Sequence, residues 1–158
     1  MSDRLAIMNH GRILQEGVPR DLYETPSDAF VAGFIGVSNF FRGELVDDQP
    51  PIVETDSGIR LAATGPRPRL APARGDRAVV VVRPERIRIG PAGAIGVAGR
   101  LVEATYLGDT IESRIDTATL GRIIVRQQNS DPSTGDRHAV GDEVTVVWDD
   151  AAAVALPD

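Results

Sequence analysis

The residues best placed to do chemistry form a short arginine-rich stretch, Arg83-Pro84-Glu85-Arg86-Ile87-Arg88. A guanidinium presents a planar set of N–H donors, so Arg83, Arg86 and Arg88 could together bind a small anion. The alternative is a rigid corner between two strands, since Pro84 fixes the backbone there and Arg83 can face Glu85 or another carboxylate. An exposed ion pair of that kind is worth up to about 1 kcal/mol. We therefore interpret Arg83, Glu85, Arg86 and Arg88 as a small-ligand site or a structural corner, and the pattern favours the corner.

The other reactive side chains are scattered. His10 and His138 are expected in turns, far apart in the sequence and without a carboxylate or serine at a suggestive spacing. The acidic pairs at 47–48 and 149–150 are expected at strand ends as surface charge rather than as a metal pair. The sequence contains no GxxxxGK[ST] loop, no GxGxxG between a strand and a helix, and no GxSxG motif. It predicts no catalytic residue, no cofactor-binding residue and no metal ligand.

Composition excludes several classes of function. The chain has 158 residues, 42% of them hydrophobic, which is enough to bury a core in one domain or in one domain with an appendage. It lacks cysteine, and all 17 basic residues are arginines, so disulfides, thiolate metal sites, Schiff-base lysines and a phosphate-binding lysine are excluded. A net charge of −6 argues against a nucleic-acid partner. No apolar run approaches the roughly 20 residues of a membrane helix, and no signal peptide is recognisable.

The first part of the chain predicts a β-hairpin followed by helices. Its apolar arms flank Asn9-His10-Gly11, where Gly11 can take the positive φ that a tight turn needs. An isolated hairpin is only marginally stable in water. We therefore expect Leu5, Ile7 and Ile13 to be covered by the β domain, by the helix that bears Phe30 and Phe34, or by a second copy.

Two short helices are expected after the hairpin. Pro19 suits the first turn of a helix over residues 21–24, and Pro26 ends it. Ser27 is predicted to cap a second helix that ends at Gly36. The spacing of one, three and four residues predicts one apolar face on this helix, made of Phe30, Val31, Phe34 and Ile35.

The remainder predicts an all-β domain, because short alternating segments are divided by Gly, Pro and Asp. Strands are expected at 40–47, 52–55, 59–63, 77–83, 86–89, 97–106, 110–116, 121–127 and 143–148. Residues 79–82 have no polar alternation, so they should be buried on both faces at the centre of the core. Residues 65–75 and 129–137 are expected to be surface loops. The arginines of the first loop are interpreted as a solvated face rather than an anion site, because its prolines prevent a nest of N–H donors.

The N-terminal stretch SDRLAIMNHGRILQEGVPRDLYETPSDAFVAGFIGVSNFFRG closely resembles the end of the nucleotide-binding domain in ATP-binding subunits of ABC importers, in the maltose, polyamine and ferric-iron branch. The matching residues are Ser2-Asp3-Arg4, Met8 with Gly11, Gln15 with Gly17 and Pro19, Leu22-Tyr23, Pro26, Phe30-Val31-Ala32 and Phe34-Ile35-Gly36.

The rest of the chain resembles the transport-associated OB-type (TOBE) domain that follows the nucleotide-binding domain in those subunits. The resemblance rests on Val82-Arg83-Pro84-Glu85, Tyr106-Leu107-Gly108-Asp109, and Gly141-Asp142-Glu143-Val144 with Trp148. The last two segments look more like the polyamine or iron branch than the sugar branch. The resemblance implies a mainly β fold, with an OB-like (TOBE) β-barrel domain over residues 38–158. It also implies that residues 1–37 are a remnant of the nucleotide-binding domain, folded as a hairpin and two short helices.

The resemblance also sets expectations for function. The family's Walker A, signature, Walker B and switch-histidine motifs would lie before this segment, so we expect a C-terminal regulatory and dimerisation segment that is not itself an ATPase. No site residue carries over, and no cofactor is expected in this chain, whereas the parent subunit would use ATP and Mg.

The implied partners are a second copy in a homodimer and, for the parent, membrane-spanning subunits and a solute-binding protein. Neither nucleic acid nor direct membrane insertion is expected, and the implied location is cytoplasmic, at the inner face of the cell membrane. The alternative is a stand-alone OB-type module that binds a small anion such as molybdate, sulfate or phosphate. A small hydrolase is a third and less favoured interpretation.

Overall fold

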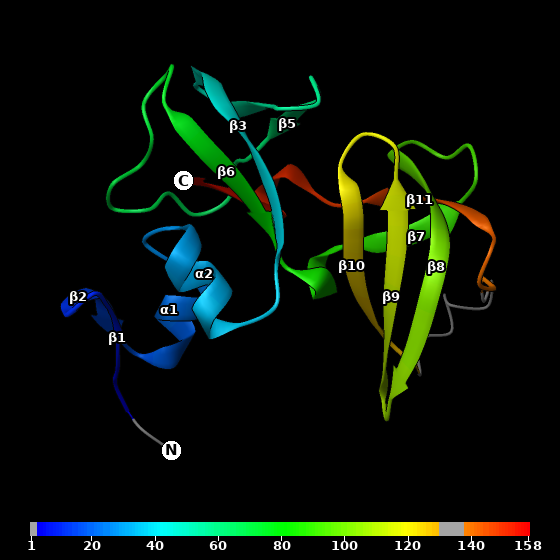
Figure 1. The fold of residues 1–158 in the computed structure, drawn as a ribbon, viewed down its shortest axis with the longest axis horizontal. Helices are drawn as coiled ribbons and strands as arrows, with labels where there is room; N and C mark the ends of the chain where they lie inside the picture. The colour runs from blue at the N-terminus through cyan, green and yellow to red at the C-terminus, as the bar shows by residue number, and fades with distance from the viewer. Residues whose placement is uncertain (1–2, 130–137) are drawn as a thin grey trace. The chain divides into compact units, whose positions relative to one another are not determined.

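A computed structural model describes residues 3–129 and 138–158, so most of the expected loop at 129–137 lies outside the described residues. The chain divides into two compact units. The first contains the residues up to Val82 together with Asp150–Asp158, and the second is Arg83–Asp149. The hairpin, both helices and one five-stranded sheet belong to the first unit, and a second five-stranded sheet forms the other (Figure 1). The expected domain boundary between residues 37 and 38 stays a prediction.

The N-terminal hairpin and the two helices form as expected, with a different cap. Strands β1 (Leu5–Asn9) and β2 (Arg12–Gly17) pair antiparallel and are followed by α1 (Pro19–Glu24) and α2 (Ala29–Ile35). The turn residues His10 and Gly11 have φ values of 48° and 74°. The side chain of Asp28 accepts a 2.9 Å hydrogen bond from the Val31 amide, so the predicted Ser27 cap is wrong. The Ser27 amide instead donates to Oε1 of Gln15, which fastens the helix entry to β2.

The helices cover only part of the hairpin. Ile7 packs with Leu22 and Val31 in a small core in which all three are at most 2% exposed. Leu5 and Ile13 remain 38% and 58% exposed. Coverage within this chain is therefore confirmed for Ile7 but not for Leu5 and Ile13, because the small core takes in Ile7 and Leu14 of the hairpin. Coverage of Leu5 and Ile13 by a second copy stays a prediction.

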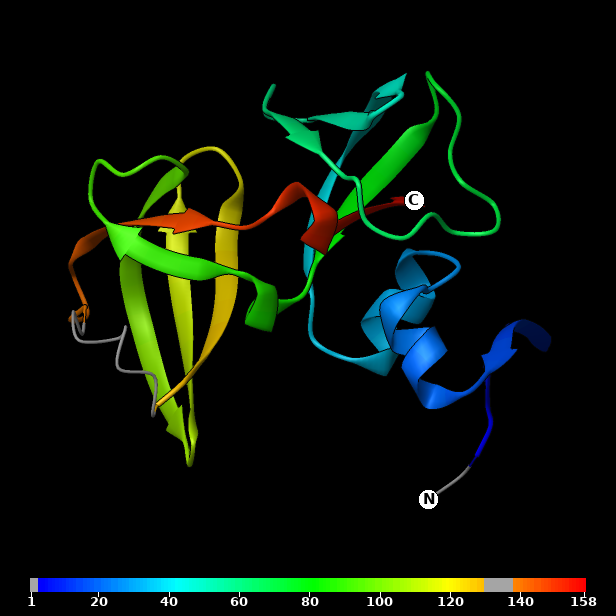
Figure 2. The same ribbon diagram turned by 180° about the vertical axis from the view of Figure 1, so that it is seen from behind.

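The sheet of the first unit is antiparallel, with the order β12-β6-β3-β4-β5 (Figures 1 and 2). Its strands are β3 (Asn39–Asp48), β4 (Pro51–Thr55), β5 (Arg60–Ala62), β6 (Arg77–Val82) and β12 (Ala153–Pro157). Residues 78–82 are each at most 4% exposed, which confirms that the unbroken valine run is the centre of the core. Strand β12 was not predicted. It pairs with β6 after a short 3-10 turn, η3 (Asp150–Ala152).

Helix α2 packs against this sheet. Ala32 contacts a cluster formed by Val79, Val81 and Leu156, with Phe40 at its margin. Two small side chains on α2, Ala32 and Gly33, let the helix approach the sheet closely. At Gly33 an added Cβ would meet the Phe40 ring at 3.4 Å.

The second unit is a five-stranded antiparallel sheet with the order β10-β9-β8-β11-β7. Its strands are β7 (Arg88–Pro91), β8 (Val97–Leu107), β9 (Thr110–Thr117), β10 (Gly121–Gln128) and β11 (Glu143–Val147). The strand expected at 86–89 begins only at Arg88, because Pro84–Arg86 forms a 3-10 turn, η1. The mainly β fold with a leading hairpin and two helices is confirmed. In the described residues both five-stranded sheets are open rather than closed into a barrel.

Carboxylates and guanidiniums alternate across one face of β8, β9 and β10. Arg122 donates two hydrogen bonds to Asp116, from Nε to Oδ1 at 2.6 Å and from Nη2 to Oδ2 at 3.0 Å. The three carboxylates and three guanidiniums of this charge ladder are Glu103, Glu112, Asp116, Arg114, Arg122 and Arg126. Hydrogen bonds from the facing arginines lower the pKa values of Asp116 and Glu103. Because the charges balance, the charge ladder is a solvated sheet face rather than an ion site.

The charge ladder predicts a loss of stability in acid. The pKa of Asp116 is lower in the folded chain than its unfolded value of about 3.9, so ionised Asp116 stabilises the fold above that pH and loses its effect as the pH falls through the native pKa. Thermal unfolding by circular dichroism should show Asp116→Asn melting below the wild type at pH 7, with the difference shrinking as the pH falls below the unfolded pKa of about 3.9. Asp109→Asn, at an exposed carboxylate facing a neutral hydroxyl, is the control. Parallel curves for Asp116→Asn and the wild type would contradict this role.

Gly43 is required where β3 pairs with β4. A Cβ on Gly43 would overlap the Glu54 carbonyl oxygen and lie 2.7 Å from Cα of Thr55, both of which are backbone atoms that cannot turn aside. We expect Gly43→Ala to lower the free energy of unfolding by about 2–3 kcal/mol in urea titrations, through overpacking. Gly33→Ala is the matched control, and it should be neutral or stabilising because alanine is the better helix former. Unchanged stability in Gly43→Ala would show that β3 and β4 are farther apart at Gly43 than described.

Candidate functional site

The predicted corner begins where β6 ends. Arg83 precedes η1 with extended backbone angles, and the Arg86 amide donates to the Arg83 carbonyl at 2.9 Å, which closes the turn. Pro84 occupies the first position of the turn, where its missing N–H costs nothing. Ile87 is buried directly after it, with 1% of its surface exposed. The local sequence therefore builds a tight turn anchored by an apolar side chain.

The charged side chains of the corner have different environments. Arg83 is only 8% exposed, and neither Arg83 nor Glu85 is without an interaction partner. Arg86 is exposed, and Arg88 is exposed and forms a 3.3 Å ion pair with Asp149. A buried arginine, an exposed one and a paired one do not make an obvious anion cluster, so the geometry agrees better with the structural corner. The small-ligand alternative for these residues stays a prediction.

The other reactive residues also stay apart. His10 lies exposed in the hairpin turn, and His138 is half-buried at the start of the second described range. Within residues 3–129 and 138–158, no group of three or more His, Asp or Glu side chains is arranged to hold a metal ion. Over the same residues, no helix is both long enough and apolar enough to cross a membrane.

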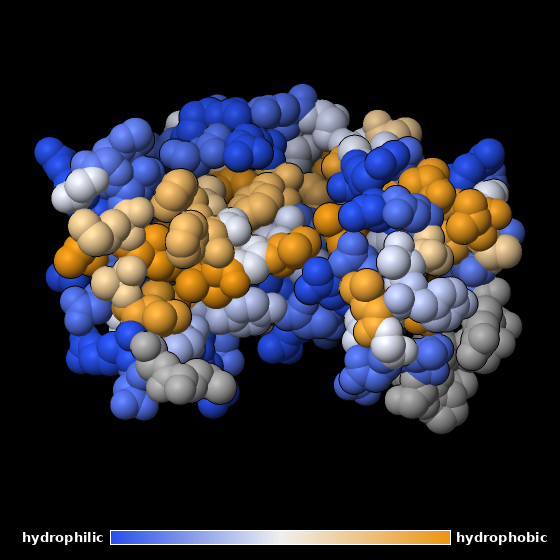
Figure 3. Space-filling model, turned by 60° about the horizontal axis from the view of Figure 1, so that its bottom comes forward, coloured by the Kyte–Doolittle hydropathy of each residue, from blue (hydrophilic) through white to orange (hydrophobic). Residues whose placement is uncertain are grey.

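The most prominent surface of the first unit is apolar and belongs to the hairpin and helices. Orange gathers densely over this part of the molecule (Figure 3). We call its residues the N-terminal apolar surface, and they are Leu5, Met8, Ile13, Val18, Phe30, Phe34 and Val37, each between 38% and 67% exposed. Large exposed apolar patches in soluble proteins mark contact sites.

Helix α2 contributes to this surface because its apolar residues divide between two directions. Val31 is fully buried and Ile35 packs against the small core, whereas Phe30 and Phe34 are 43% and 67% exposed. The two phenylalanine rings stack with their centroids 6.2 Å apart. Only part of the predicted apolar face is therefore buried, and both phenylalanines lie on its exposed part. Their spacing of four residues on an otherwise apolar helix was the available signal, since such a helix has more apolar surface than one neighbour can cover.

The two-stranded sheet β1–β2 adds unpaired strand edges to the N-terminal apolar surface. In the described part of the chain no third strand joins it. Each edge of such a sheet presents backbone N–H and C=O groups that another segment can pair with. An apolar surface next to open edges can bind a partner by packing and by strand pairing together.

Comparisons with known proteins show what the sequence is similar to. The family model of the TOBE domain matches residues 80–156. The chain is 38% identical over 151 residues to the spermidine/putrescine import ATP-binding protein PotA of Rubrobacter xylanophilus, and 39% identical over 162 residues to PotA of Thermobifida fusca. These matches cover 94% and 99% of this chain but only 39% and 41% of the relatives. The Fe(3+) ions import ATP-binding protein FbpC of Agrobacterium fabrum is 38% identical over 117 residues, which is 74% of this chain and 32% of FbpC.

A structural comparison supports the OB-like fold. The molybdate-binding protein ModG superimposes with a TM-score of 0.61 at 13% sequence identity, covering 76% of this chain and 96% of ModG. At that identity the likeness concerns the fold alone. The sequence relatives are more specific: residues 80–156 belong to the TOBE domain family, and the chain as a whole matches the C-terminal part of ATP-binding subunits of ABC importers.

Proposed function

We propose that this chain serves as the C-terminal regulatory and dimerisation part of an importer's ATP-binding subunit, of the spermidine/putrescine or ferric-iron kind. The similarity to PotA and FbpC proteins over most of the chain supports this assignment. The chain spans about two fifths of the length of its PotA relatives, so it would act on transport through a catalytic part that those relatives contain.

The N-terminal apolar surface is the observation that carries the proposal. Burying apolar area contributes about 25 cal/mol per Å², so leaving Ile13 and Phe34 more than half exposed forgoes stabilisation that a covering partner would supply. In the parent subunit the partner would be the catalytic part, with β1 and β2 joining its sheet. The TOBE region would then be held beside the ATPase, where it can bias the approach of two subunits.

ATP and Mg belong, in this proposal, to the catalytic part and not to this chain. A nucleotide-binding loop needs a glycine-rich turn followed by lysine, and this sequence contains no lysine. The chain alone would then neither bind nor hydrolyse ATP.

The partners follow from the same assignment. The chain would pair with a second copy through the β-rich units, and the parent would contact membrane-spanning subunits and receive solute from a binding protein. It would lie in the cytoplasm at the inner face of the membrane without inserting. Nucleic acid is not a partner in this proposal, since the chain carries a net charge of −6.

A second candidate is an OB-type module that binds a small anion. The fold likeness to the molybdate-binding protein ModG favours it, and Arg83, Arg86 and Arg88 would be the residues to supply donors. The burial of Arg83 and the ion pair of Arg88 make it the weaker of the two candidates.

Self-association tests the N-terminal apolar surface. We expect the isolated chain to form species larger than a dimer with increasing concentration in light scattering, and the double variant Ile13→Asp with Phe34→Asp to lose these larger species without losing thermal stability. Ile95→Asp is the matched control, because Ile95 is 95% exposed but lies in the second unit. A strict monomer at high concentration, or an equal effect of Ile95→Asp, would count against this surface.

Calorimetry separates the two candidate functions. The full chain should give no binding heat with Mg-ATP, molybdate, sulfate or phosphate at sub-millimolar concentrations. Saturable heat with an oxyanion that disappears in Arg86→Gln with Arg88→Gln would instead support the anion-binding module. Saturable heat with Mg-ATP would contradict the assignment of nucleotide binding to the catalytic part.

A further inference from the structure

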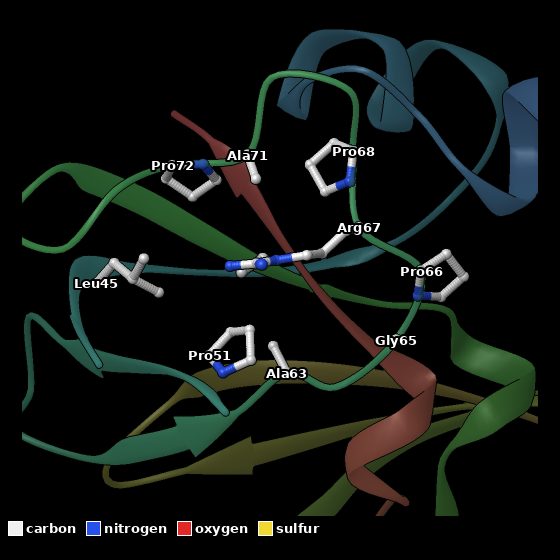
Figure 4. Close-up of a pocket in the computed structure, with 10 residues that line it drawn as sticks. Leu45, Pro51, Ala63, Gly65, Pro66, Arg67, Pro68, Ala71 and Pro72 are labelled. Atoms are coloured by element: carbon white, nitrogen blue, oxygen red, sulfur yellow. The ribbon is translucent and has the colours of Figure 1, made fainter. Parts of the chain in front are cut away.

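A groove in the first unit lies between a proline-rich segment and the free edge of β12. We call residues 65–72 the proline strap. Its side chains and those of β3, β4 and the residue after β5 line a depression that is open to solvent (Figure 4). The walls are apolar, formed by Leu45, Pro51, Ala63, Pro68 and Pro72. None of the ten residues that line it is acidic.

The groove exists because the proline strap cannot continue the sheet. The Gly65 amide donates to the Ala153 carbonyl at 2.9 Å, as the next strand of a sheet would. A Cβ on Gly65 would lie 2.6 Å from that oxygen, so glycine permits this approach. Beyond it, Pro66 and Pro68 have no N–H to donate, and the strap moves away from β12.

The withdrawal of the proline strap leaves a polar backbone site at the floor of the groove. In an antiparallel strand, alternate residues direct their N–H and C=O groups to the same side. Since the Ala153 carbonyl points away from β6 to Gly65, the backbone groups of Ala155 also point away from β6, towards the open edge of β12. Ala155 is only 7% exposed, and within the described residues no backbone bond from the strap reaches it. Buried donors of this kind are satisfied by a ligand or by water.

Arg67 brings a positive charge to the same place. Its side chain runs from the strap across the groove, between Pro51 and Ala63 on one side and Pro68 and Pro72 on the other (Figure 4). Nη2 donates to the Asp48 carbonyl at a long 3.3 Å. No ion pair of Arg67 occurs among residues 3–129 and 138–158, unlike those of Arg42, Arg60 and Arg77 in the same unit. The guanidinium therefore retains donors for an anion.

We propose that this groove binds a small carboxylate with a short aliphatic body. One carboxylate oxygen pair accepts hydrogen bonds from the Arg67 guanidinium, whose fork geometry suits a carboxylate. The aliphatic body lies against the proline and alanine walls. One of the same carboxylate oxygens also accepts a hydrogen bond from the Ala155 amide. An inorganic oxyanion would leave the apolar walls unused. An extended peptide strand would find little to pair with, since the next outward residue of β12 is Pro157, which has no N–H.

The experiment is a titration of the full chain, labelled with ¹⁵N, with sodium butyrate followed by amide chemical shifts. We expect saturable shifts of the Ala155 and Gly65 amides, and at least about a tenfold weaker affinity in Arg67→Met, which keeps an aliphatic stem of similar length. Arg69→Met is the matched control, because Arg69 lies on the same strap but does not line the groove. Butyramide and sulfate serve as ligand controls, and each should bind at least tenfold more weakly than butyrate.

Four results would overturn the proposal. Shifts at Ala155 that fail to saturate, or an unchanged affinity in Arg67→Met, would remove the site. Equal binding of butyramide would show that the charge of Arg67 plays no part. Equal binding of sulfate would show that the aliphatic walls play none. The proposal does not rest on the parentage of the chain, so its failure would leave the self-association test of the N-terminal apolar surface unaffected.

Discussion

The burial of strand β6 is the constraint on which the first unit depends. Five consecutive side chains, from Ala78 to Val82, leave no polar face, so both faces of the strand and both of its backbone edges must be covered. Strand β3 pairs along one edge and β12 along the other, although β12 comes from the far end of the sequence. Ala32 of α2 packs over Val79 and Val81. This contact joins the N-terminal segment to the sheet.

The same arrangement leaves two surfaces incomplete. Ala32 of helix α2 packs against the sheet and Val31 packs against the hairpin. Phe30 and Phe34 are therefore directed to solvent. At the other edge, β12 is paired by Gly65 only at its first residue, and the prolines that follow leave Ala155 beside a groove. One surface is broad and apolar and suits a protein partner. The other is small, and its only charged lining residue is Arg67, which suits a small anionic ligand.

Local patterns in the sequence predicted most of the fold. The valine run, the hairpin turn and all nine expected strands could be placed, with β7 beginning two residues later than expected, because alternation and turn residues act over a few positions. The Ser27 cap was wrong because Asp28 is also a good cap and the choice depends on Gln15, twelve residues away. Strand β12 was missed because AVALP gains its strand conformation from pairing with β6. The loop arginine Arg67 was interpreted as solvated, and it is exposed in the structure. That its side chain lies across a groove could not be predicted, because the groove is formed by residues distant in the sequence.

The central claim is that the N-terminal segment of this chain is completed by the catalytic part of an ATP-binding subunit. Hydrogen exchange measures this directly, with the chain alone and mixed with the ATP-binding part of a PotA relative. We expect the amides of residues 5–17 and 29–37 to gain protection in the mixture, while those of β8–β10 stay unchanged. Equal exchange of residues 5–17 in both samples, at concentrations where the catalytic part is folded, would contradict the account.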